Sequence, residues 1–124
     1  MQDRQTASRP SIYYFHPALG GEMAGWSRHL DRCGAMGFSH LLLAPLFQPG
    51  RSGNIFLTAD HDACHPALQS GAPAASHLRQ LAEDCHSRGI KLWLDLVLDR
   101  VAREARVVAD AEAGTVRRAH QMLA

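Results

Sequence analysis

The fold is decided by residues 89–100, Gly89-Ile90-Lys91-Leu92-Trp93-Leu94-Asp95-Leu96-Val97-Leu98-Asp99-Arg100. Leucine recurs at every second position, which is the spacing of one face of a β-strand. We expect this leucine face to pack under helices, so the opposite face carries Asp95 in mid-strand and Asp99 at the carboxyl end. Burying an unpaired carboxylate is costly, and α/β folds bind ligands at the carboxyl ends of their strands. The stretch therefore predicts a binding site as well as a strand.

Strand and helix patterns alternate along the chain. Besides the strand above, the predicted elements are strands at 12–16 and 39–45 and helices at 23–36, 74–88, 101–113 and 115–123. Gly37 and Gly89 stand where two helices should stop. Residues 46–73 are expected to form one long loop without a hairpin, and loops of this length are usually functional or disordered. The order β-α-β-α-β-α predicts an α/β fold with parallel strands and right-handed crossovers.

Size and composition indicate one compact domain. The chain has 124 residues, of which 46% are hydrophobic and 20% charged, enough to bury a core. A formal net charge of +1 without a run of Lys or Arg argues against nucleic acid as a partner. No apolar run approaches the roughly 18 residues of a membrane span, and residues 1–10 lack a hydrophobic signal-peptide centre. We therefore expect a cytoplasmic protein with no membrane partner.

The three cysteines, Cys33, Cys64 and Cys85, are an odd number without Cys-x-x-Cys spacing. Cys33 and Cys85 fall on the apolar faces of predicted helices. We interpret them as small buried hydrophobic residues rather than as a disulfide.

Several short motifs follow one another in a characteristic order. They are Tyr13-Tyr14-Phe15, Ala35-Met36-Gly37-Phe38, Leu43-Ala44-Pro45, a loop segment at 55–61 followed by Pro66, His86-Ser87-Arg88-Gly89, and Asp95-Leu96-Val97-Leu98-Asp99-Arg100. This succession resembles the N-terminal part of the α-amylase family of (β/α)8-barrel glycoside hydrolases and glucanotransferases. The resemblance implies that residues 12–101 are the first three β/α units of such a barrel. Residues 1–11 would then be an N-terminal extension and 102–124 a C-terminal helical tail.

The resemblance also implies a set of residues near a sugar: Phe56, Asp60, Asp95, Asp99 and Arg100. Phe56 stands where the family has a tyrosine that stacks on the sugar, although packing within the loop is the favoured interpretation of this side chain. Asp60 would fix its loop through backbone N–H groups, and Asp95 would pair with an arginine or with backbone N–H groups.

Two of these positions depart from the family pattern. Asp99 replaces an asparagine that commonly helps to bind calcium. No cofactor is assigned, and Ca²⁺ near Asp99 is kept as the weaker alternative, because Asp is a competent calcium ligand. Arg100 replaces a histidine, and its planar fork suits phosphate, which favours a maltosyltransferase-like relative. A metal at Asp60, His61, Asp62 and His65 is the weaker interpretation, because a loop lacks the fixed spacing of helical ligands, so no metal site is assigned.

No catalytic residue is assigned within the chain. The family's three catalytic carboxylates lie on later strands, and Asp95 and Asp99, about 13 Å apart by strand rise, are too far apart for glycoside hydrolysis. We expect a glycosidase or a glucanosyl or maltosyl transferase acting on α-glucans or maltose-type sugars, with the isolated chain inactive.

Two alternatives stay open. One is a non-catalytic half-barrel that binds sugar or assembles with a partner chain, and the other is a small flavodoxin-like binding domain. The second is weakened because no phosphate loop follows the first strand. A half-barrel leaves strand edges unpaired, which predicts a homo-oligomer or association through those edges.

Overall fold

Three parallel strands form the central sheet of the computed structural model, which describes residues 9–115. The strands are β1 (Ile12–Phe15), β2 (His40–Leu43) and β5 (Lys91–Leu94), in the order β1-β2-β5. Their register aligns Tyr14 with Leu42 and Leu42 with Trp93. The prediction of an α/β fold with parallel strands is confirmed.

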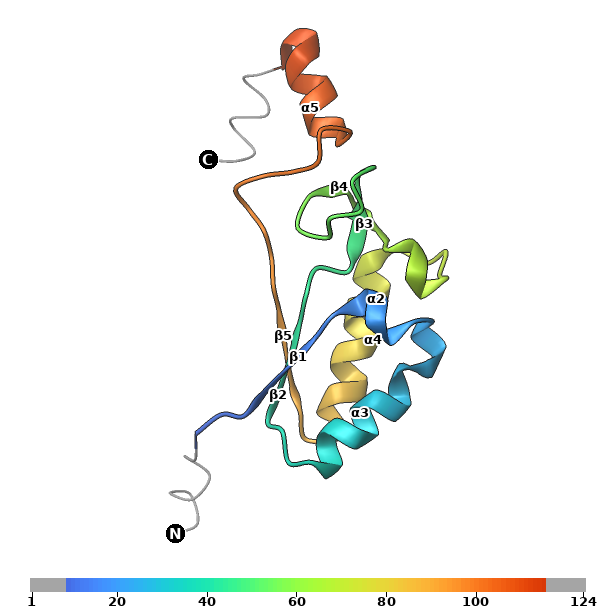
Figure 1. Ribbon diagram of the computed structural model, residues 1–124, viewed down its shortest axis with the longest axis vertical. Coiled ribbons are helices and arrows are strands. Elements are labelled where there is room, and N and C mark those ends of the chain that lie inside the picture. The colour runs from blue at the N-terminus through green and yellow to red at the C-terminus, as the bar shows by residue number, and fades with distance from the viewer. Residues whose placement is uncertain (1–8, 116–124) are drawn as a thin grey trace.

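Two helices cover one face of this sheet. α3 (Trp26–Ala35) lies between β1 and β2 in the chain, α4 (Ala74–His86) lies between β2 and β5, and both pack on the same side (Figure 1). Two short elements lead into α3, namely α2 (Pro17–Gly20) and the 3-10 helix η1 (Met23–Gly25). Within residues 9–115, no helix lies over the opposite face of the sheet (Figure 1).

The core lies between the sheet and these two helices. Phe15 and Trp26 meet edge to face, with ring centroids 4.9 Å apart. Leu30, Leu41 and Leu81 are buried in the same hydrophobic cluster as this aromatic pair. Burial of a leucine side chain contributes about 1.5–3 kcal/mol to stability. Cys33, Cys64 and Cys85 are free and buried, which confirms the interpretation of Cys33 and Cys85 as small buried hydrophobic residues.

Glycines end both helices, as predicted. Gly37 has a φ of +84° and Gly89 a φ of +73°, in the left-handed region that glycine adopts without a steric penalty. After each glycine the next amide donates back into the helix, Phe38 to Cys33 O at 3.2 Å and Ile90 to Cys85 O at 2.9 Å.

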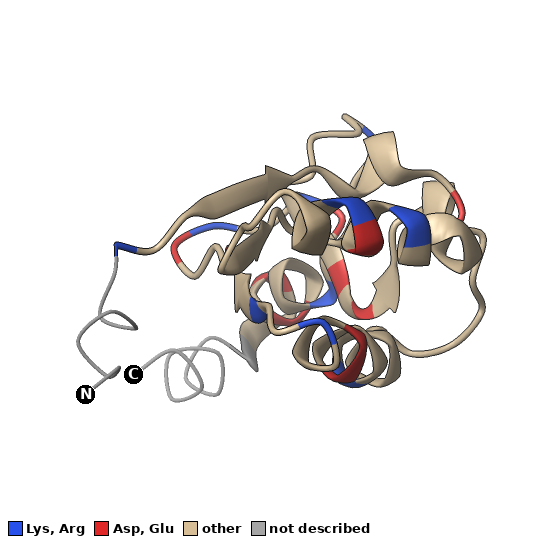
Figure 2. Ribbon diagram, turned by 90° about the horizontal axis from the view of Figure 1, so that it is seen from below, with Lys and Arg blue, Asp and Glu red and all other residues tan. Residues whose placement is uncertain are grey.

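Charged groups of both signs are interspersed along the helices (Figure 2). An ion pair joins α3 to the segment just after α4, because Arg88 Nε lies 2.7 Å from Asp31 Oδ1 of α3. None of the helices in the described part of the chain is long and apolar enough to cross a membrane.

The prediction of an irregular loop over 46–73 is wrong. β3 (Phe47–Pro49) and β4 (Thr58–Cys64) pair as an antiparallel hairpin, and the 3-10 helix η2 (Pro66–Leu68) follows. The middle of β4 is polar and exposed, and only its ends, Thr58 and Cys64, are buried. The alternation that normally reveals a strand is therefore missing from the sequence.

The predicted long third strand is also wrong, since β5 ends at Leu94 and Asp95 follows it rather than lying in mid-strand. The last ladder bond is from Asp95 N to Leu43 O, at 2.8 Å. Pro45 in the neighbouring segment has no N–H with which to continue the ladder. Leu92 packs against the core, but Leu96 and Leu98 are 51% and 76% exposed, so the leucine face is only partly buried.

The helix predicted at 101–113 starts later than expected. α5 (Arg106–Asp110) runs into the π-helix η3 (Ala111–Thr115), where Gly114 has a φ of +92°. The preceding segment is held to the hairpin instead, because Ala102 N donates to Thr58 O at 2.8 Å. The short helix predicted at 115–123 lies outside the described residues, apart from Thr115 at its start.

Candidate functional site

The carboxyl ends of the three parallel strands meet at one edge of the sheet. His16, Ala44 and Asp95 are the residues that directly follow β1, β2 and β5. Ala44 N donates to Phe15 O at 3.0 Å, and Asp95 N donates to Leu43 O. The strand register therefore continues to the first residue after β2 and after β5. This is the edge at which α/β folds place their ligands.

Asp95 lies at this edge close to Tyr14. Its side chain is half-buried. Burial raises the pKa of Tyr14, and the negative charge of Asp95 raises it further. No hydrogen bond or ion pair joins the Asp95 carboxylate to another side chain or to an amide within residues 9–115, so the expected pairing is not found there. The carboxylate is available to accept hydrogen bonds from a ligand.

Two aromatic side chains lie on the same bare face of the sheet as Asp95. Tyr14 and Trp93 are 49% and 43% exposed, and in the register both align with Leu42. The indole of Trp93 contacts the imidazole of His40, with ring centroids 4.3 Å apart. Large apolar surfaces that keep a polar edge are typical of binding sites.

Phe56 and Asp60 belong to the β3–β4 hairpin. Phe56 is 38% exposed in the turn, where its amide donates to Asn54 Oδ1 at 2.9 Å. Asp60 Oδ1 accepts from the amide of Asp62 at 2.8 Å, as expected for a residue that fixes its own loop. The bond from Ala102 to Thr58 joins this hairpin to the segment that follows β5.

Asp99 and Arg100 form a local, exposed ion pair. Arg100 Nη2 donates to Asp99 Oδ2 at 2.8 Å, and Nε donates to the same oxygen at 3.2 Å. The side chains are 67% and 63% exposed, respectively. The hydrogen bond from Arg100 lowers the pKa of Asp99 and raises the pKa of Arg100. Five residues predicted from the sequence thus fall into three groups: Asp95 at the sheet edge, Phe56 and Asp60 in the hairpin, and the Asp99–Arg100 pair.

The donors around Asp99 do not fit a calcium ion. Calcium takes six to eight oxygen ligands, several of them carboxylates. Asp99 is engaged with a cation, and no group of three His, Cys, Asp or Glu residues within 9–115 is placed to hold a metal. This holds also for the cluster of Asp60, His61, Asp62 and His65, whose side chains are not placed to share a metal ion.

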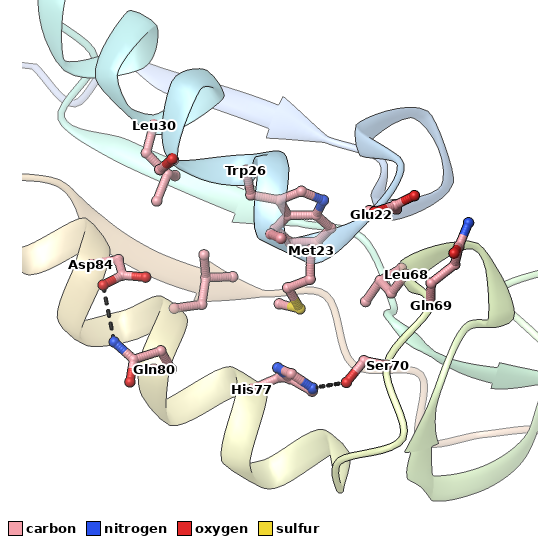
Figure 3. Close-up of a pocket in the computed structure, with 13 residues that line it drawn as sticks. Glu22, Met23, Trp26, Leu30, Leu68, Gln69, Ser70, His77, Gln80 and Asp84 are labelled. Carbon is pink, nitrogen blue, oxygen red and sulfur yellow. Dashed lines mark hydrogen bonds between the residues drawn. The ribbon is translucent and has the colours of Figure 1, made fainter.

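A cavity, which the sequence analysis missed, lies between α3 and α4 (Figure 3). Its volume is about 460 Å³. Trp26 and Met23 line one wall, and His77, Gln80 and Asp84 of α4 line the other. The last three are spaced i, i+3, i+7, so they form a polar stripe beside the apolar stripe of α4. This polar stripe was the sequence signal that could have indicated the cavity.

The described residues form a parallel α/β unit whose strand ends meet at one edge, and comparison with known proteins gives its relatives. A 95-residue stretch is 30% identical to the alpha-1,4-glucan:maltose-1-phosphate maltosyltransferase of Burkholderia pseudomallei (strain K96243), covering 77% of this chain and 8% of that enzyme. An 86-residue stretch is 29% identical to the cyclomaltodextrinase of Geobacillus thermopakistaniensis (strain MAS1), covering 69% of this chain and 14% of that enzyme. No family model matches the chain.

The solved structures agree. Trehalose-6-phosphate hydrolase of Bacillus licheniformis superposes with a TM-score of 0.70 and 25% identity, over 85% of this chain and 20% of that one. The α-glucosyl transfer enzyme XgtA shares the fold with a TM-score of 0.69 at 21% identity, over 82% and 20%. The chain is therefore related to the α-amylase family, as the motifs predicted, and it spans well under two thirds of the length of these relatives.

Proposed function

We propose that the chain forms part of a glycosidase or a glucanosyl or maltosyl transferase that acts on α-glucans. Residues 12–101 would supply the first three β/α units of a (β/α)8 barrel and one wall of its sugar site. The observation that carries this proposal is the strand-end edge, where half-buried Asp95 lies near exposed Tyr14 and Trp93. Support comes from the maltosyltransferase and the cyclomaltodextrinase, whose names specify glucan and maltose chemistry.

The residues at this edge suit a sugar. The rings of Tyr14 and Trp93 offer apolar surface to the C–H groups of a pyranose. The unpaired carboxylate of Asp95 would accept hydrogen bonds from its hydroxyl groups, and bonds to a charged acceptor are the stronger ones. Phe56, on the exposed turn of the hairpin, would add a further apolar contact.

The chain alone is expected to be inactive. Glycoside hydrolysis uses two carboxyl groups placed on either side of one bond. Of the three residues that directly follow β1, β2 and β5, only Asp95 carries a carboxyl group. Further strands would have to supply the catalytic carboxylates.

The test is a titration of the purified chain with maltotriose, followed by amide chemical shifts. We expect shifts at Tyr14, Trp93 and Asp95, and binding several-fold weaker in Asp95→Asn. Asp62→Asn, an exposed carboxylate in the middle of β4, is the matched control. An absence of shifts at this edge would refute the sugar wall. Turnover of maltooligosaccharides that survives repurification and is lost in Asp95→Asn would refute the inactive assignment.

Maltosyl transfer is the finer version of this proposal. The guanidinium of Arg100 suits a phosphate group, and the maltosyltransferase relative is named for maltose 1-phosphate. Arg100→Ala should then weaken binding of maltose 1-phosphate and leave binding of maltose unchanged. Equal effects on both ligands would remove the phosphate role of Arg100.

A non-catalytic half-barrel is the second candidate, and the bare sheet face favours it. Ile12, Tyr14 and Trp93 leave a contiguous apolar surface on that face. If Trp93→Lys dissolves an assembly without altering maltotriose binding, the face serves a partner chain. If the same change abolishes maltotriose binding, the face serves the sugar.

A further inference from the structure

We propose that the cavity between α3 and α4 is a second, non-catalytic binding site for a neutral polyhydroxylated ligand, and that a maltose-type saccharide is the ligand class. Its volume of about 460 Å³ lies within the range of small-molecule sites. The cavity lies among the helices that cover one face of the sheet (Figures 1 and 3). Tyr14 and Trp93 share a register position and are exposed on the face that these helices leave bare. The cavity is therefore separate from the strand-end site.

The α4 wall of the cavity carries hydrogen-bonding groups that are already oriented. Gln80 Nε2 donates to Asp84 Oδ1 at 3.0 Å, and Ser70 Oγ is hydrogen-bonded to His77 Nε2. These bonds leave the Gln80 carbonyl oxygen and Asp84 Oδ2 as acceptors. Adjacent acceptors and donors of this kind match neighbouring hydroxyl groups.

The opposite wall is mostly apolar, with the polar side chains Glu22 and Ser27 also lining it. Met23 and Trp26 line it, and Leu30 and Leu81 lie deeper between the helices. Trp26 is held in place because its Nε1–H donates to Gly21 O at 3.1 Å. One polar wall and one mostly apolar wall suit a ligand that has hydroxyl edges and C–H faces.

The charges of the lining select against anions. Glu22 and Asp84 are carboxylates, and none of the Lys or Arg residues within 9–115 lines the cavity. A phosphate or a carboxylate ligand would meet like charge there. A neutral ligand fits this lining.

The backbone at the rim gives an independent observation. Gln69 has a φ of +49°, which makes it the single non-glycine residue with positive φ in the part of the chain that the structure describes. Such conformations are costly for a residue with a Cβ, and they cluster at functional sites. Gln69 lines the cavity with its neighbours Leu68 and Ser70.

The choice of a maltose-type sugar rests on the proposed function, whereas the neutral polyol class rests on the cavity itself. The test uses the indole N–H signals of the two tryptophans, which are assigned with Trp93→Phe. Trp26 reports on the cavity and Trp93 on the bare sheet face. With maltotriose we expect shifts of the Trp26 indole signal and of the amides of residues 69–84, and with inorganic phosphate no shift.

Variants make the assignment specific. Gln80→Leu, which keeps the side-chain bulk, should weaken this response at least threefold, and Arg79→Leu, an exposed neighbour outside the cavity, should not. Gln69→Gly should relieve the backbone conformation and raise the melting temperature, yet weaken the same response. Loss of stability in Gln69→Gly, or an unchanged response in both Gln69→Gly and Gln80→Leu, would overturn the proposal.

The cavity proposal and the strand-end proposal can be refuted independently of each other. Shifts at Trp93 alone would overturn the cavity proposal and leave the strand-end proposal standing. Shifts at Trp26 alone would do the reverse. A phosphate response at Trp26 would also overturn the cavity proposal, because it would contradict the selection against anions.

Discussion

Burial raises the pKa of Tyr14, and the negative charge of Asp95 raises it further. In a Tyr13→Phe background Tyr14 is the sole tyrosine of the chain. Asp95→Asn should then lower the pKa of Tyr14, while burial keeps it above the ordinary value. An ultraviolet titration of the phenolate measures this, with Asp99→Asn as the control. An unchanged Tyr14 pKa in Asp95→Asn would mean that the two side chains do not interact.

Substitutions of Asp95 and Arg100 test whether the Asp95 carboxylate has a partner in the folded chain. The sequence suggested that loss of Asp95 would leave a partner unsatisfied, but no partner is found among residues 9–115. Because a half-buried carboxylate is costly to desolvate, Asp95→Asn should keep or raise the melting temperature. Arg100→Ala should change it little, since exposed ion pairs contribute little. A clear loss of thermal stability in Asp95→Asn would reveal a partner for its carboxylate.

At the scale of elements, burial separates leucines that look equivalent in the sequence. Leu81 of α4 is 3% exposed, and Leu98, beyond the end of β5, is 76% exposed. Leu81→Ala should destabilise the fold by about 2–5 kcal/mol, and Leu98→Ala by less than about 0.5 kcal/mol. Urea denaturation of both variants is the measurement. Similar losses would mean that Leu98 packs in solution as the original strand prediction required.

Two short helices share an unusual start, which the sequence analysis missed. The tetrapeptide His-Pro-Ala-Leu occurs at 16–19 and 65–68. In each copy the histidine Nδ1 accepts from the amide two residues on, His16 from Ala18 at 3.2 Å and His65 from Ala67 at 3.0 Å. α2 and η2 also pack against each other. Both caps need an unprotonated Nδ1.

This arrangement predicts acid sensitivity. Burial, and then the charge of His16, lower the pKa of His65. The folded state therefore binds that proton less readily than the unfolded chain, so its contribution to stability is complete above about pH 6.5 and declines below it. His65→Asn retains a capping side chain and should flatten the profile of unfolding free energy against pH. His86→Asn, exposed at the end of α4, should leave the profile unchanged, and equal profiles for wild type and His65→Asn would contradict the cap.

At the scale of the whole molecule, the bare sheet face and two open strand edges predict self-association. Light scattering should report a dimer or a larger assembly. Trp93→Lys should shift the protein towards monomer. Leu19→Lys removes an equally apolar side chain from α2, where Leu19 is 84% exposed, and should not. A monomer at high concentration, or equal effects of both changes, would rule out this face as the contact.

Much of this molecule is determined by local sequence. Gly37 and Gly89 fix the ends of two helices through backbone conformations that favour glycine. The alternation of elements predicts parallel pairing of the strands, and the succession of motifs resembles that of the α-amylase family. These features depend on neighbours in the chain, so a linear pattern records them.

The length of β5, the β3–β4 hairpin and the helix cavity were decided by tertiary structure. β5 stops at Leu94 because Pro45, which follows the neighbouring strand β2, has no N–H group to donate to it. Pro45 lies far from β5 in the sequence. The hairpin pairs the three-residue strand β3 with the polar strand β4. Neither strand shows the alternation of hydrophobic residues by which a strand is recognised in a sequence. The polar stripe of α4 becomes one wall of a cavity only because Met23 of η1 and Trp26 of α3 lie opposite it. Each depends on which groups meet across the fold, and distances between segments are not encoded in their local pattern.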